Sequence, residues 1–167
     1  MKFFRKIALM APAVLVFSFS GAAQADITNA GFVVTVFYDG QPWRGLTVVT
    51  TVPPSSMVQP STSQDTRTIA RCENGGLSGR QVVDGISAII VPQGNDANGV
   101  INARVVINAN HINAIRTITT GSCSEQVVDA DAGNVDRVFA IGPKPVTVLQ
   151  AGPLRAQVQR ADLVFPH

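Results

Sequence analysis

Three of the 11 acidic residues of this 167-residue chain lie close together in one short segment, where they could ligate a metal ion. Asp129, Asp131 and Asp136 alternate there with alanine, glycine and asparagine, an oxygen-rich pattern typical of calcium-binding loops. The spacing departs from the EF-hand pattern, because Gly133 stands where a third ligand should be and no bidentate glutamate follows. We therefore favour an ordinary acidic turn at 129–136 and keep a calcium site as the alternative.

A second candidate site is aromatic. Tyr38 and Trp43 flank an Asp39-Gly40 turn, in a stretch that also contains Phe32 and Phe37. The two larger rings could form a stacking surface for a glycan, or for an apolar side chain of a protein partner. The alternative, which we favour, is that they pack against the core.

Nucleophilic catalysis lacks the residues that it needs. A serine triad requires a histidine base, and the chain has only His111, expected at the end of a strand, and the C-terminal His167. The stretch 76–79 does not match the nucleophile-elbow motif, and no phosphate-binding loop, dinucleotide fingerprint or zinc-protease motif occurs. We expect no catalytic residues and no cofactor, with an enzyme that uses carboxylates alone as a minor alternative.

Cys72 and Cys123 are the only cysteines. Neither has a second cysteine or a histidine at metal-ligand spacing, so we favour a structural disulfide over a metal site or a free thiol. The disulfide would close a loop of about 50 residues, which the chain-entropy model values at roughly 4 kcal/mol.

The first 25 residues have the form of a secretory signal peptide. Three basic residues precede the uncharged run 7–19, and Ala23 and Ala25 match the cleavage pattern. The uncharged run would make a helix of roughly 20 Å, too short for a ~30 Å hydrocarbon core. We expect cleavage after Ala25 and a single β domain over 26–167, with no membrane anchor, in the periplasm or outside the cell. The absence of N-glycosylation acceptors after the leader favours a bacterial source.

Cleavage would also change the net charge. The leader holds three of the 13 Lys and Arg residues and none of the 11 Asp and Glu residues, so the remaining chain has a net charge of −1. A charge near zero, with no basic patch, gives no reason to expect nucleic acid as a partner.

The elements that must position these residues are strands. Residues 101–110 alternate between the apolar set Ile101, Ala103, Val105, Ile107 and Ala109 and a mostly polar set, which predicts a strand with one buried face. Other β-rich segments are separated by Gly, Pro, Asn and Asp, and no helical periodicity appears after the leader. We expect strands at 31–38, 46–52, 66–72, 86–91, 101–120, 135–141, 146–149, 154–158 and 163–165.

This spacing favours an all-β fold with one disulfide, either an antiparallel β-sandwich (Ig-like or jelly-roll-like) or a small barrel. The sequence then predicts an exported, non-enzymatic binding or interaction module with a protein or glycan partner, its oligomeric state left open. The alternative is a structural subunit or accessory protein of a surface or secretion assembly, completed by strand exchange with a neighbour. The β-prone segment Phe32–Phe37 supports that alternative.

Overall fold

The computed structural model describes residues 28–52, 58–73, 76–95 and 99–161. The segment 1–25 expected to be a signal peptide, its expected cleavage site, the expected strand at 163–165 and His167 lie outside these residues. The described chain forms eight strands: β1 (Thr28–Tyr38), β2 (Gln41–Val52), β3 (Ser61–Glu73), β4 (Gly76–Asn95), β5 (Ile101–Thr120), β6 (Cys123–Ile141), β7 (Val146–Ala151) and β8 (Leu154–Ala161).

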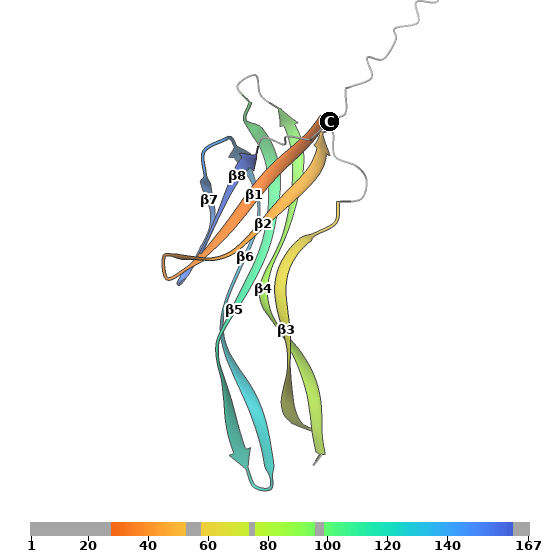
Figure 1. Ribbon diagram of the computed structural model, residues 1–167, viewed down its shortest axis with the longest axis vertical. Coiled ribbons are helices and arrows are strands. Elements are labelled where there is room, and N and C mark those ends of the chain that lie inside the picture. The colour runs from red at the N-terminus through yellow and green to blue at the C-terminus, as the bar shows by residue number, and fades with distance from the viewer. Residues whose placement is uncertain (1–27, 53–57, 74–75, 96–98, 162–167) are drawn as a thin grey trace, which may run out of the picture.

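The strands form two antiparallel sheets, which confirms the all-β class and is consistent with the sandwich (Figure 1). The first sheet has the order β2-β1-β8-β7 and the second the order β3-β4-β5-β6. Within the described ranges, no helix is long and apolar enough to cross a membrane.

The core lies between the two sheets, where alternate side chains of each strand point inward. The alternation predicted for 101–110 is confirmed, since Ile101, Ala103, Val105 and Ile107 are at most 1% exposed. From the other sheet, β1 contributes a buried row of side chains to this core: Phe32, Val34 and Val36.

The segment Phe32–Phe37, which we expected as support for strand exchange, is not at a sheet edge. It belongs to β1, which pairs with β2 on one side and with β8 on the other. Its backbone groups are therefore already used within the chain, so a neighbour could pair with it only by displacing β2 or β8.

Two turn predictions had different outcomes. Asp39 and Gly40 connect β1 to β2 with positive φ values of 50° and 78°, as a two-residue hairpin turn of the primed type requires. The acidic turn expected at 129–136 is wrong, because β6 runs through it in a ladder with β5 from Ile141 to Cys123. Pairing with a long neighbour overrides the low β-propensity of Asp, Ala and Gly there.

The second sheet extends well past the first, and the parts of its strands that lie beyond the first sheet form two separate hairpins (Figure 1). The β4–β5 ladder ends at Gly85 and Asn110, whereas the β3–β4 and β5–β6 ladders continue to their hairpin ends. We call this point the fork, and we call the two hairpins beyond it the β3–β4 arm (residues 65–84) and the β5–β6 arm (residues 111–131).

Candidate functional site

Two features define the structure at the fork. Gly85 allows a close approach of β3 to β4, and side-chain hydrogen bonds connect β4 to β5 where their backbone pairing ends. A Cβ atom on Gly85 would lie 2.4 Å from the Cα atom of Gln64 on β3, so no other residue fits there without movement of the backbone. Beyond Gly85, Asp84 Oδ1 accepts a hydrogen bond from the Ile112 backbone N–H at 3.0 Å, and the Asn110 side-chain amide donates to the Val83 carbonyl. Side chains thus extend the connection between β4 and β5 by one step past the last backbone pair.

Asp84 is a buried charge at this point, with only 6% of the residue exposed. Arg44 on β2 lies 3.9 Å from its Oδ2 atom and also forms an ion pair with Asp65 on β3 at 2.5 Å. The hydrogen bond and charge of Arg44 lower the pKa of the Asp65 carboxyl. One arginine of the first sheet is therefore held against two carboxylates of the second sheet beside the fork.

The aromatic candidates Tyr38 and Trp43 meet at the same place, on either side of His111. The ring centroids of Tyr38 and His111 are 4.0 Å apart, and those of Trp43 and His111 are 4.6 Å apart. The expectation that His111 lies at a strand end is wrong, because β5 continues through it to Thr120, and its side chain is 21% exposed. Its Nδ1 atom is buried, and the nearest carboxylate oxygen, Asp84 Oδ1, lies 3.5 Å away and forms no hydrogen bond with it.

Tyr38 also links the first sheet to β6. Its hydroxyl oxygen lies 2.9 Å from Asp131 Oδ2 and 2.8 Å from Asn113 Oδ1, and the Asn113 amide donates to Asp131 at 2.8 Å. The hydrogen bonds from Asn113 and Tyr38 lower the pKa of Asp131, and the hydrogen bond to Asp131 raises the pKa of Tyr38. The structure thus joins one residue of the acidic segment to the aromatic pair.

The other two acidic candidates lie elsewhere on β6. Asp129 binds Arg116 at 2.7 Å, and Asp136 binds Arg104 through two hydrogen bonds of 2.7 and 2.6 Å. The hydrogen bond from Arg104 lowers the pKa of Asp136. The structure does not bring Asp129, Asp131 and Asp136 together, and the described residues contain no group of three or more histidine, cysteine or acidic side chains placed to hold a metal ion.

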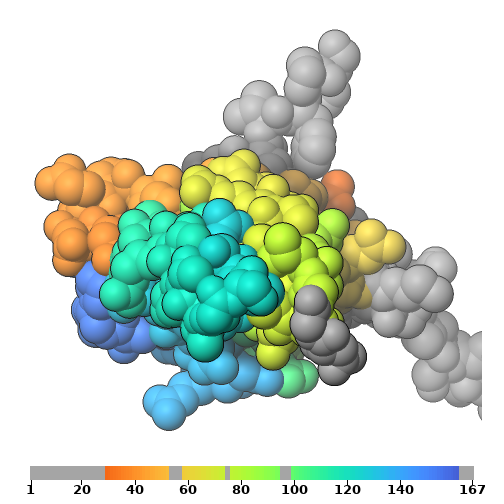
Figure 2. All heavy atoms as spheres, turned by 90° about the horizontal axis from the view of Figure 1, so that it is seen from below, coloured from red at the N-terminus to blue at the C-terminus, as the bar shows by residue number. Residues whose placement is uncertain are grey.

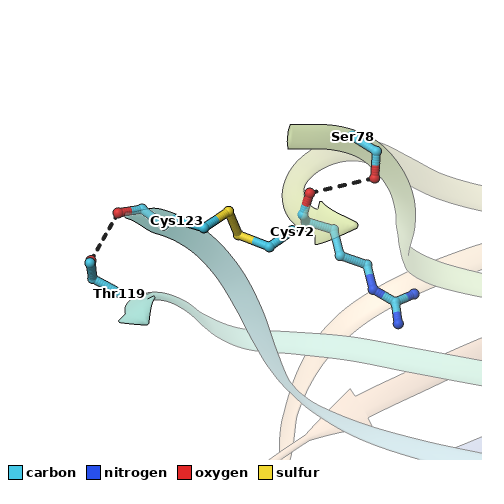
Figure 3. Close-up of a disulfide and its surroundings, with 6 residues drawn as sticks. Cys72, Ser78, Thr119 and Cys123 are labelled. Carbon is cyan, nitrogen blue, oxygen red and sulfur yellow. Dashed lines mark hydrogen bonds between the residues drawn. A yellow bond between two sulfur atoms is a disulfide. The ribbon is translucent and has the colours of Figure 1, made fainter. Parts of the chain in front are cut away.

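The disulfide predicted between Cys72 and Cys123 is confirmed, and it joins the two arms near their ends (Figure 3). The Cα atoms are 6.3 Å apart. Between the disulfide and the fork, the Ala70 backbone N–H donates to the Gln126 side-chain oxygen at 2.9 Å. The outer strands β3 and β6 are therefore tied together beyond the fork, whereas no strand pairing joins β4 to β5 there.

The arms enclose an open hollow of about 640 Å³. Its walls combine apolar side chains such as Ile69 and Val82 with two arginines, Arg71 and Arg80, and one carboxylate, Glu125. Figure 2 views the molecule from the arm ends, with the β5–β6 and β3–β4 arms in front of the sandwich. The hollow is thus open, partly apolar and more cationic than anionic.

Exposed apolar side chains also gather on the arms. Five large hydrophobic side chains are exposed among the described residues. Three of them lie beyond the fork: Leu77 at 69%, Val83 at 39% and Ile118 at 47%. They belong to β4 and β5, the two strands that separate.

Several residues of the site had no individual signal in the sequence. Arg44 follows Trp43 and Asn113 lies between Ile112 and Ala114, and neither belongs to a motif. Asp84, in contrast, interrupts the apolar stretch 82–86. A lone charge in such a stretch predicts a buried, paired group, and that pattern could have identified Asp84. Its partners come from distant parts of the chain and could not have been read from it.

Comparison with models of protein families, with curated proteins and with solved structures finds no match to this chain.

Proposed function

We propose that this protein is an exported, non-enzymatic interaction module that holds a protein partner between its two arms. The observation that carries the proposal is the split of the second sheet at Gly85 and Asn110 into two disulfide-linked hairpins around an open hollow. Strands that extend past the hydrophobic core bury little apolar surface within the chain, so stability of the sandwich alone does not explain them.

Export is proposed from the leader-like segment 1–25 together with the disulfide. Disulfides persist in oxidising compartments such as the periplasm and the extracellular space. Cys72–Cys123 is compatible with such a compartment, and it connects two hairpins that have few other contacts to hold them.

A protein partner fits the site better than a glycan. Glycan binding would use an accessible aromatic face, but Tyr38 and Trp43 both pack on His111, and the Arg44 guanidinium lies 5.5 Å from the Trp43 ring centre. These rings fix the first sheet to the fork. Three of the five most exposed large apolar side chains among the described residues lie instead on the arms, where a protein surface could cover them.

The same packing supports the non-enzymatic part of the proposal. His111 packs against two rings, and Asp131 accepts hydrogen bonds from Tyr38 and Asn113. We propose that these groups position strands and transfer no proton to a substrate.

Site-specific photocrosslinking tests the proposal. A photoreactive phenylalanine analogue replaces Leu77 or Ile118 on the arms, and Val49 or Val138, which are 55% and 53% exposed, serve as matched controls on the sandwich. With the full chain expressed in its own cells, we expect one discrete heterologous adduct from the arm positions and none from the controls. Equal adducts from all four positions, or none from the arms, would contradict the proposal.

The same experiment addresses the alternative of a structural subunit. A ladder of adducts at multiples of the chain's own mass would favour a homopolymer, in which neighbouring copies contact one another. A single adduct of different composition would favour the interaction module.

A further inference from the structure

We infer that the edge of β4 beyond the fork binds an extended acidic peptide strand, which adds to the β3–β4 arm as a third strand. This inference rests on the proposed function, because it specifies the kind of segment that the arms would hold. It concerns residues 76–84, where β4 has β3 on one side and has lost β5 on the other.

The backbone of β4 presents hydrogen-bonding groups to the open side. In an antiparallel strand the N–H and C=O of one residue point to the same side, and the side alternates along the strand. The Val83 carbonyl accepts a hydrogen bond from Asn110 on β5, so the groups of Val83 point toward the open side. The β3–β4 register has no shift from Val83 to the hairpin end, so those of Gln81, Gly79 and Leu77 point the same way.

This edge is accessible. Gly76 and Gly79 have no side chain to shield the backbone, and within the described residues no other strand pairs with the edge. A row of unpaired N–H and C=O groups is the usual template for strand addition, in which an incoming peptide supplies the missing partners.

The side chains on the two faces of β4 specify the incoming strand. Arg80 and Val82 are on one face of β4, whereas Leu77 and Val83, which are 69% and 39% exposed, are on the other. Side chains of both faces, Arg80, Val82 and Val83, line the hollow. An added strand would place its side chains alternately beside these two sets. Acidic residues on one face and apolar residues on the other complement them.

The charge of the hollow supports the acidic part of the inference. Arg71 lies 3.6 Å from Glu73, but Arg80 has no ion pair with any described residue, and Glu125 is the one carboxylate among the lining residues. An acidic side chain beside Arg80 would gain a partner, and a basic one would be repelled.

A second copy of this chain fits the same edge less well. If β4 paired with β4 of another copy about a two-fold axis near the middle of residues 76–84, Arg80 would lie beside its own counterpart. Like charges placed opposite one another across a strand pair are destabilising. We therefore assign the edge to a separate acidic strand.

The test uses the full mature chain and a fluorescent synthetic peptide in which glutamate alternates with valine. A peptide with lysine in place of glutamate, and one with a central proline, serve as controls for charge and for strand formation. Binding is followed by fluorescence anisotropy, and amide hydrogen exchange of the protein is followed with and without peptide. We expect the glutamate peptide to bind, and to slow exchange of the Leu77, Gly79 and Gln81 amides.

Two variants at one position separate the backbone from the side chain. Gln81→Pro removes an N–H that points away from β3, so the β3–β4 ladder keeps its hydrogen bonds while the open edge loses a donor. Gln81→Ala keeps that N–H. We expect binding to weaken about tenfold or more in Gln81→Pro and to change little in Gln81→Ala. Arg80→Glu should reverse the preference between the glutamate and lysine peptides.

Several results would overturn the inference. They are no binding of the glutamate peptide at about 1 mM, equal binding of the lysine peptide, or protection of amides outside residues 76–84. Dimerisation of the free protein through this edge, measured by light scattering, would assign the edge to a second copy instead. Should Gln81→Pro fail to fold, the exchange pattern of the unmodified protein still decides the matter. Photocrosslinking at Leu77 and Ile118 stays informative in every case, since a partner could bind the arms without strand addition.

Discussion

The hydrogen bond from the Ile112 backbone to Asp84 offers a direct test of how β4 and β5 are joined at the fork. Asp84 and Ile112 are 6% and 8% exposed, and the bond between them measures 3.0 Å. We predict that Asp84→Ala destabilises the protein markedly and that Asp84→Asn does so much less, because an asparagine side chain retains an oxygen that can accept the same bond.

The magnitude follows from the groups left without a partner. A buried N–H that loses its acceptor costs about 1–3 kcal/mol. The Arg44 guanidinium, 3.9 Å away, loses one of its two carboxylates and keeps Asp65, which adds up to about 1 kcal/mol. We therefore expect a loss of roughly 1–4 kcal/mol in the free energy of unfolding for Asp84→Ala and up to about 1 kcal/mol for Asp84→Asn, which keeps the acceptor and loses only the charge.

Urea denaturation of both variants and the wild type measures this difference, provided that the m-value is unchanged. Hydrogen exchange at the Ile112 amide supplies a local readout, and it should become faster in Asp84→Ala only. Asp65→Ala is the control, because Asp65 contacts the same arginine from an exposed position. Equal losses in Asp84→Ala and Asp84→Asn, with unchanged exchange at Ile112, would refute the reasoning.

Three further predictions concern other parts of the site. Gly85→Ala should lower stability by about 1–3 kcal/mol in thermal unfolding, because its Cβ atom would lie 2.4 Å from the Gln64 Cα atom; an unchanged Tm would show that the strands can separate freely. Replacing Cys72 and Cys123 by serine should lower the free energy of unfolding by up to about 4 kcal/mol. It should also accelerate amide exchange more in the arms than in the sandwich, and equal acceleration in both would show that they unfold together. The pKa of Asp131 is lowered in the folded state, so its stabilisation is present above the ordinary aspartate value of 3.8 and is lost as the pH falls through the lower folded value. Melting curves of Asp131→Asn should therefore depend less on pH in that acidic range than those of the wild type, and parallel profiles would contradict this.

The parts of the fold that sequence reasoning predicted correctly depend on local patterns. The alternation of 101–109 is a property of one strand with one face on the core, and the Asp39-Gly40 turn follows from backbone conformations that few residues adopt. The Cys72–Cys123 disulfide followed from there being two cysteines. None of these predictions required knowledge of which strands are neighbours.

The fork could not be predicted in this way, because it depends on where the pairing between β4 and β5 stops. Residues 111–120 were correctly expected to be β-structured, but their sequence does not show that they have lost the partner that residues 101–110 have. The acidic turn failed for a related reason, since the conformation of 129–136 is imposed by its neighbour β5. Tyr38 and Asp131 were both selected from the sequence, but their contact joins residues 93 positions apart.

The position of the disulfide explains how the chain can keep an unpaired edge. A two-stranded hairpin is marginally stable alone, and the arms lie beyond the core that stabilises the sandwich. Cys72–Cys123 and the Ala70–Gln126 hydrogen bond connect the arms through β3 and β6, the strands farthest from the fork opening. The inner edges of β4 and β5 are therefore held in an extended conformation without a strand paired to them.

An exposed edge of this kind promotes aggregation unless a charge opposes it, and Arg80 lies in the middle of the free β4 edge. The same arginine that opposes self-pairing would favour an acidic strand, so the features that keep the arms open and separate also define the partner that we propose for them.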